Sequence, residues 1–312
     1  MNQETLQELL LNASDASLDP AAIDLDSANG LRFVLQQSFR YQYAGPVATV
    51  DQRLVVVPPP RHGAQRRTFH RLSVSGADGI ATWSRDAFAN AVARVEVAAV
   101  AESVTFQVVA VIERSGGGPV LLPAAALTDP RYLGATRLTD SNEAMVNAAY
   151  DGAGAQPHGV EAAERICALV HDALPYRKGT TAVGTTAADA FRIGAGVCQD
   201  HAHLMLAMCR TLGIPARYVS GHMLGEGATH AWVEVIVPHP KRADRTVAAP
   251  FDPCHGRQPD ASYITVAVGR DYADVAPTSG TYQGKFANHL TSDTRLSVRV
   301  VEGAPPSVGA GG

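Results

Sequence analysis

The hydrophobic pattern of this chain changes near residue 115, and that change most constrains the fold it can adopt. Over residues 31–114, short stretches rich in β-branched and aromatic residues are separated by Pro, Gly and Asp, which is typical of serial antiparallel strands. After the Ser-Gly-Gly-Gly-Pro stretch at 115–119, apolar residues recur at helical spacing, and strand-like segments return after residue 215. This order predicts an α+β protein whose first part is all β.

We therefore expect four segments in the 312-residue chain. Residues 1–30 form an N-terminal extension with a short helix, and residues 31–115 form an antiparallel β-sandwich-like domain. Residues 120–295 form a core of helices and strands. Residues 296–312 form a tail that ends in a disordered Gly- and Pro-rich stretch.

The charge and hydropathy of the chain exclude several classes of partner. The formal charge is −4 with 18% charged residues, which gives no electrostatic reason to expect nucleic acid or an anionic membrane as a partner. No apolar run approaches the roughly 18 residues of a membrane span, and the first residues lack the basic and apolar regions of a signal peptide. We predict a cytoplasmic protein, and the sequence does not indicate its oligomeric state.

Four cysteines occur without a Cys-x-x-Cys pair, and we expect all four to be free thiols. Cys167 and Cys209 fall on apolar helical stripes, so we interpret them as buried core residues. Cys254 can be interpreted either as a structural residue or as a functional one. Cys198 differs from the others because it follows a Gly-Ala-Gly-Val turn and opens a predicted helix.

The position of Cys198 favours a catalytic role for its thiol. A thiol at a helix N-terminus lies at the positive end of the helix dipole, which stabilises the thiolate. The unpaired backbone N–H groups of the first helical turn can also hold a developing oxyanion. One location therefore supplies an activated nucleophile and part of an oxyanion hole.

Two further residues complete a candidate triad. His230 begins the strand-like segment 230–237, where alternation puts it on one face with Trp232 and Glu234. Asp252 ends the next apolar stretch, and a hairpin between the two segments would bring it near His230. Each residue alone has an ordinary explanation, since His230 suits a polar surface and Asp252 precedes Pro in a common turn. We interpret Glu234 as a solvated strand charge.

The segments GVCQDHAHLMLAMCRTLGIPARYVSGHM, THAWVEV and FDPCHGR closely resemble the bacterial transglutaminase-like core, a branch of the papain-like thiol enzymes. RYQYAGPV and SRDAFANAV resemble the β-rich N-terminal region that accompanies this core. The similarity covers roughly residues 32–290 and implies that 120–295 is the catalytic core. It also implies that Cys198 is the nucleophile, His230 the base and Asp252 the orienting acid.

The sequence departs from the family pattern at Cys254, where Thr or Ser is common after Asp-Pro, and Phe251 is the aromatic residue available before the acid. Tyr176, in the segment LPYRKG, is our candidate for a second oxyanion donor, although a packed tyrosine fits the sequence equally well.

A metal site is the main chemical alternative, because six histidines occur around these segments. Cys198 and His201 can share a helix face, but His201 and His203 point in different directions and no closed ligand set emerges. We predict no metal and no cofactor.

The resemblance implies a cysteine hydrolase that cleaves peptide or isopeptide amide bonds through a thioester on Cys198, with a peptide or protein as substrate. The alternatives are acyl transfer to an amine, which passes through the same thioester, and a binding module without catalysis.

Overall fold

The structure is a computed structural model that describes residue 25 and residues 30–116 and 118–301. The helix predicted within residues 1–30 and residues 302–312 of the predicted tail lie outside the described residues. None of the described helices combines the length and the hydropathy that a membrane-spanning segment requires.

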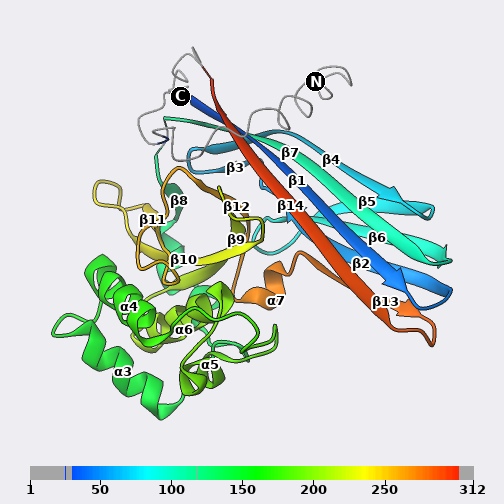
Figure 1. Ribbon diagram of the computed structural model, residues 1–312. Coiled ribbons are helices and arrows are strands. Elements are labelled where there is room, and N and C mark those ends of the chain that lie inside the picture. Colours follow the sequence, from blue (N-terminus) through cyan, green and yellow to red (C-terminus); the bar gives the residue numbers. More distant parts are fainter. Residues whose placement is uncertain (1–24, 26–29, 117, 302–312) are drawn as a thin grey trace.

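Two antiparallel sheets pack face to face as a sandwich of long strands (Figure 1). The larger sheet has the strand order β14 (Asn288–Val300), β1 (Gly30–Tyr43), β7 (Ser103–Ser115), β4 (Gln65–Ser75) and β3 (Arg61–His62). The smaller sheet has the order β13 (Thr278–Gln283), β2 (Val47–Val57), β6 (Ala91–Val100) and β5 (Gly79–Arg85). The alternation predicted from the sequence is visible in β1, where Phe33, Leu35 and Phe39 are buried and Arg40 is exposed.

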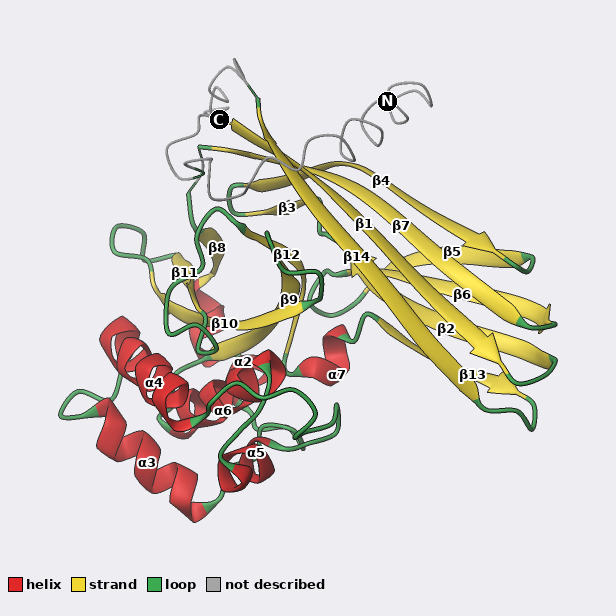
Figure 2. Ribbon diagram, in the orientation of Figure 1, coloured by secondary structure: helices red, strands yellow, loops and turns green. Residues whose placement is uncertain are grey.

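The core contains a third antiparallel sheet and most of the helices. Its strand order is β12 (Tyr263–Gly269), β9 (Ala216–Met223), β10 (His230–Pro238), β11 (Arg245–Phe251) and β8 (Val120–Pro123). The helices are η2 (Ala124–Thr128), α2 (Pro130–Leu133), α3 (Glu143–Ala153), α4 (Gly159–Ala173), α5 (Ala187–Ile193), α6 (Cys198–Thr211) and α7 (Tyr272–Val275). Figure 2 shows α3 to α6 grouped on one side of the core sheet, away from the long strands.

The helix α6 carries the first candidate site residue and is buried along nearly its whole length. Every residue from Gln199 to Arg210 is buried, including two histidines. The sequence predicted a single apolar stripe, whereas the structure surrounds this helix on all sides with α3, α4, α5, β9 and β10. Because such a helix is packed on every face, its N-terminus is held in a fixed position.

The domain boundary predicted at residue 295 falls inside β14. This strand pairs along its length with β1, from Leu31 opposite Val300 to Tyr43 opposite Asn288. The strand β13 likewise joins β2 in the smaller sheet. The chain therefore leaves the sandwich after β7, forms the core and returns to the sandwich, so residues 278–300 belong to the sandwich by their pairing.

Two buried amide side chains join the sandwich to the edge strand of the core sheet. Gln65 accepts a hydrogen bond from the N–H of Thr265 at 3.0 Å and donates one to its carbonyl at 2.7 Å. Asn90 makes the same pair of bonds with Val268, at 2.9 and 2.7 Å. An open strand edge exposes unpaired backbone groups, so these amides satisfy β12 as a neighbouring strand would.

Candidate active site

Cys198 is the first residue of α6, and a tight turn positions it. The carboxylate of Asp200 accepts the backbone N–H of Val197 at 2.8 Å and the hydroxyl of Thr181 at 2.7 Å. A Cβ at Gly196 would lie 2.7 Å from the Cβ of Asp200, so only glycine allows this close approach. The turn therefore fixes the thiol at the helix N-terminus, where the first N–H groups have no partner within the helix.

His230 is the first residue of β10 and is 3% exposed. Its imidazole stacks on the Trp232 ring, with centroids 6.1 Å apart and planes 26° apart, as the predicted alternation requires. Its Nε2 lies 2.8 Å from Oδ2 of Asp252. Because Nε2 is committed to the carboxylate, Nδ1 is the nitrogen that remains for the hydrogen bond with Cys198.

Asp252 follows β11 and is fully buried. Oδ1 accepts the backbone N–H groups of Cys254 and His255 at 2.9 and 3.2 Å. Oδ2 accepts His230 Nε2 and His255 Nδ1, each at 2.8 Å, and the hydroxyl of Tyr263 at 2.7 Å. Burial raises the pKa of this carboxyl, but the hydrogen bond and charge of His230, with the bonds from Tyr263 and His255, outweigh burial and hold the pKa below its ordinary value.

The same contacts keep the imidazole of His230 charged. Burial disfavours the imidazolium, but the hydrogen bonds and charges of Asp252 and Cys198 outweigh it and raise the pKa of His230 to about 10. An imidazolium and a thiolate in contact form the ion pair that is the reactive form of a thiol enzyme. The structure therefore brings together the three residues that the sequence proposed.

The other three cysteines have different surroundings. The prediction that all four thiols are free is confirmed, as is the burial of Cys167 and Cys209. Burial is the largest cause that raises the pKa of each of these two thiols to about 12. The thiol of Cys254 is part-buried, and its pKa is raised by burial and then by the charges of Cys198 and Asp252.

Tyr176 reaches the site through its backbone, which forms a parallel bridge with Gly196 just before Cys198. Its side chain is 52% exposed. Burial of the remaining part, and then the charges of Cys198, Cys254 and Glu226, raise the pKa of its hydroxyl. Tyr176 thus lies at the rim of the site, and its role as an oxyanion donor stays a prediction.

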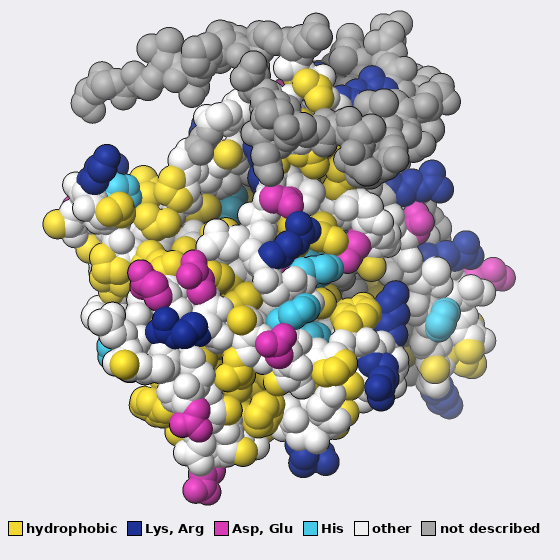
Figure 3. All heavy atoms as spheres, turned by 60° about the vertical axis from the view of Figure 1, so that its left-hand side comes forward, with side chains coloured by type: hydrophobic (Ala, Val, Ile, Leu, Met, Phe, Trp, Pro, Cys, Tyr) yellow, Lys and Arg dark blue, Asp and Glu magenta, His cyan; other side chains and the backbone are white. Residues whose placement is uncertain are grey.

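Besides Tyr263, whose hydroxyl donates to Asp252, sequence reasoning missed His255 and Glu226, which also contact the triad. His255 shares Oδ2 of Asp252 with His230. Glu226, in the turn between β9 and β10, lies 3.5 Å from Nδ1 of His230 and 3.6 Å from Nε2 of His255. The dense histidines of the sequence pointed to His255, but no pattern distinguishes Glu226 in its Gly-rich turn. Figure 3 shows histidine side chains gathered near the middle of one face of the molecule, with acidic side chains close by.

Glu234 corrects a sequence prediction, because it is a buried ion rather than a solvated strand charge. It is 3% exposed and lies 2.6 Å from Nη2 of Arg217 and 2.6 Å from Nε2 of His62. Burial raises the pKa of this carboxyl, but the charge of Arg217 and then that of His62 lower it to about 2. Since His62 belongs to β3, this ion pair also joins the core to the sandwich.

One group of side chains has the composition of a metal site. Ligand atoms of His230, Asp252 and His255 lie within 4.8 Å of one another. This set differs from the Cys198–His201 pair considered from the sequence, and Nδ1 of His201 is instead hydrogen-bonded to the carbonyl of Val197 at 2.9 Å. In the described structure hydrogen bonds to Asp252 link the two histidines of this set, so the group needs no metal to be satisfied.

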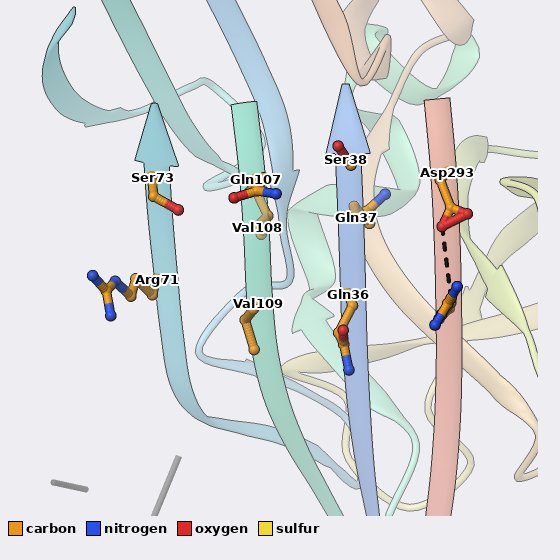
Figure 4. A pocket seen from close by; sticks show the side chains of 10 residues that line it. Gln36, Gln37, Ser38, Arg71, Ser73, Gln107, Val108, Val109 and Asp293 are labelled. Carbon is orange, nitrogen blue, oxygen red and sulfur yellow. Dashed lines mark ion pairs between the residues drawn. The ribbon is translucent and has the colours of Figure 1, made fainter. Parts of the chain in front are cut away.

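A hollow lies on the outer face of the larger sheet, across β14, β1, β7 and β4 (Figure 4). It has a volume of about 350 Å³ and is lined by Gln36, Gln37, Ser38, Arg71, Ser73, Gln107, Val108, Val109, Asp293 and Arg295. None of these lining residues is a cysteine or a histidine. This hollow therefore lacks the thiol and imidazole groups of the candidate site.

Two family models match the sequence. Residues 34–113 match the bacterial transglutaminase-like N-terminal region, and residues 146–244 match the transglutaminase-like superfamily. An uncharacterized protein of Mycobacterium leprae is 40% identical over 127 residues, which cover 38% of this chain and 43% of that protein. An uncharacterized protein of Mycobacterium tuberculosis is 29% identical over 315 residues, which cover 93% of this chain and 97% of that protein.

A solved structure from Cytophaga hutchinsonii, described as a "putative cysteine protease", superposes with a TM-score of 0.69 at 20% identity. The match covers 89% of this chain and 94% of that one, and it confirms the predicted fold class. Residues 146–244 are therefore similar to the transglutaminase-like superfamily and residues 34–113 to the bacterial transglutaminase-like N-terminal region, in agreement with the motifs.

Proposed function

We propose that this protein is a cysteine hydrolase that cleaves peptide or isopeptide amide bonds through a thioester on Cys198. The observation that carries the proposal is the contact of Cys198 with His230, together with the buried hydrogen bond of 2.8 Å between Nε2 of His230 and Oδ2 of Asp252. Its order and geometry match the requirements of a nucleophile, a base and an orienting acid. The thiol-enzyme fold of the core supports the same conclusion.

Each residue has a defined part in the proposed reaction. The thiolate of Cys198 attacks the amide carbon, and the N–H groups at the start of α6 stabilise the oxyanion. The imidazolium of His230 gives its Nδ1 proton to the leaving nitrogen, so that an amine departs and a thioester remains. Water then attacks the thioester while Nδ1 takes its proton, and the acid product leaves the free thiol. Asp252 holds the ring in one orientation throughout.

Acyl transfer to an amine is the second candidate, because it shares the thioester and differs only in the acceptor. Intact-mass spectrometry after incubation with a peptide and amide library tests both. The wild type should gain the mass of an acyl group, and the Cys198→Ala variant should not. Loss of the adduct in water indicates hydrolysis, and faster loss with added amines indicates transfer.

A binding module without catalysis predicts no adduct in either protein. Retention of hydrolytic activity by the Cys198→Ser variant, which keeps the shape of the side chain, would also contradict the proposal.

A further inference from the structure

The site contains two carboxylates in contrasting surroundings. Asp252 is fully buried and accepts five hydrogen bonds of 3.2 Å or less. The Glu226 side chain is 37% exposed, and its oxygens lie 3.5 Å from His230 and 3.6 Å from His255. Both distances exceed those of ordinary N–H···O hydrogen bonds. One carboxylate is thus committed to the protein, whereas the other keeps hydrogen-bonding capacity that faces solvent.

The turn that carries Glu226 is ordered by its own backbone. Its N–H donates to the carbonyl of Met223 at 3.1 Å, and Gly225 has a φ of +89°, which favours glycine. This turn joins β9 to β10, so the carboxylate is held within four residues of His230. Glu226 is therefore a fixed feature of the rim.

The position of Glu226 identifies the side of the substrate that it faces. Nδ1 of His230 is the nitrogen that exchanges a proton with the leaving amine, because Nε2 is bonded to Asp252. Glu226 lies 3.5 Å from this same Nδ1. A carboxylate beside the proton donor is next to the leaving group, while the acyl part of the substrate lies over Cys198 and the start of α6.

We propose that Glu226 determines specificity by selecting amides whose leaving group carries a second, protonated amine. The proposal rests on the proposed function, since it assigns the leaving-group subsite of that reaction. The ammonium of the leaving group pairs with the Glu226 carboxylate, while the scissile nitrogen receives its proton from His230. Substrates whose leaving group ends in a carboxylate are repelled by the same charge.

Charged thiol reagents test the subsite without knowledge of the acyl group. Three methanethiosulfonates carry a 2-aminoethyl, a neutral 2-hydroxyethyl or a 2-sulfonatoethyl group. Each transfers its thioalkyl group to a thiolate, forms a disulfide and releases methanesulfinate. Peptide mass mapping follows the rate at Cys198 separately from the rates at the other thiols. In the wild type we expect the cationic reagent to react at least about tenfold faster than the anionic one, relative to a free thiol in solution.

The Glu226→Gln variant should lose this preference, which is read as the ratio of the cationic to the anionic rate at Cys198. Glu102→Gln removes an exposed acid in the turn between β6 and β7 and should keep the preference. The wild-type preference should also shrink when salt is raised from 0.05 to 0.5 M, since an exposed carboxylate is screened.

Two failures of this test are distinguishable. An equal preference in the wild type and Glu226→Gln, with Cys198 still highly reactive, would overturn the subsite and leave the proposed hydrolase intact. If Glu226 serves only as a counter-ion of the two histidines, all three rates fall together in Glu226→Gln and their ratio is unchanged, which also overturns the subsite. A Cys198 that reacts no faster than a free thiol with any reagent contradicts the proposed function itself.

Discussion

Replacing Asp252 with asparagine should raise the pH at which Cys198 becomes reactive. The pKa of His230 is raised from 6.5 to about 10, a net stabilisation of the imidazolium of about 5 kcal/mol. Burial opposes that charge, and Asp252 shares its support with the thiolate of Cys198. If the carboxylate supplies about half of this stabilisation, its removal destabilises the imidazolium by about 2.5 kcal/mol. This corresponds to a fall of nearly two pH units in the pKa of His230.

The direction of the expected shift follows from the effect of the His230 imidazolium on the thiol of Cys198. Without the carboxylate the pKa of His230 falls, so the imidazolium no longer favours the thiolate at neutral pH. Asparagine cannot restore the contact, because one side of Asp252 accepts three hydrogen bonds and the other accepts two, and the amide NH₂ group must face one of these sets of donors. The lower limb of the pH profile for alkylation should therefore move upward by at least one pH unit.

The assay is the second-order rate of iodoacetamide labelling at Cys198 between pH 4 and 9, read by peptide mass mapping. Asp260→Asn is the matched control, since Asp260 pairs with Arg257 at 3.0 Å rather than with His230. Circular dichroism verifies that both variants are folded. Superposable profiles for the wild type and Asp252→Asn would refute the role given to the carboxylate.

Three further predictions follow from the structure. At pH 8 iodoacetamide should label Cys198 at least about 10³ times faster than Cys167 or Cys209. The two buried thiols have a pKa of about 12, so each is ionised in about one molecule in ten thousand at this pH. Equal labelling in the folded protein would contradict an activated thiol at Cys198. Tyr176→Phe should lower turnover by about 10²-fold without changing the labelling of Cys198, because the hydroxyl acts only on the oxyanion; unchanged turnover would remove Tyr176 from the oxyanion hole. Glu234→Gln should destabilise the fold by about 3–5 kcal/mol, because it leaves the buried guanidinium of Arg217 without its charged partner. Urea titration at pH 7 measures this loss, and a value below about 1 kcal/mol would contradict the prediction.

The pH dependence of stability provides a second measurement on Glu234. Its pKa in the folded state, about 2, is below the ordinary 4.5. The ionised carboxylate therefore stabilises the fold above about pH 4.5, and this contribution is lost as the pH falls through about 2. The wild type should lose stability over this range, and Glu234→Gln should lose less.

The candidate triad was predictable because its signals are local. The glycines before Cys198 mark a turn, and the apolar repeat after it marks a helix. Two short strands around the polar loop 239–244 form a hairpin, which brings the end of one strand near the start of the other. Such contacts leave a pattern in neighbouring residues. The resemblance to a known family then connected the three residues as one candidate triad.

The missed features depend on contacts between distant parts of the chain. The pattern of β10 gives Glu234 a polar position, but only the folded chain reveals Arg217 and His62 beside it. The strand β14 is exposed over most of its length, so its sequence lacks the apolar alternation that predicts a half-buried strand. Its partner β1 lies more than 200 residues earlier, and no local rule connects the two.

The return of β13 and β14 has a consequence for how the chain folds during synthesis. Ribosomes release residues from the N-terminus onward, so β1 and β2 leave the ribosome long before the strands that pair with their outer edges. The sandwich remains incomplete while the whole core is being made, and the pairing of Leu31 with Val300 closes a loop of nearly the entire described chain. Such distant pairing is slow. We therefore expect the core to fold first and the final edge strands to complete the sandwich last.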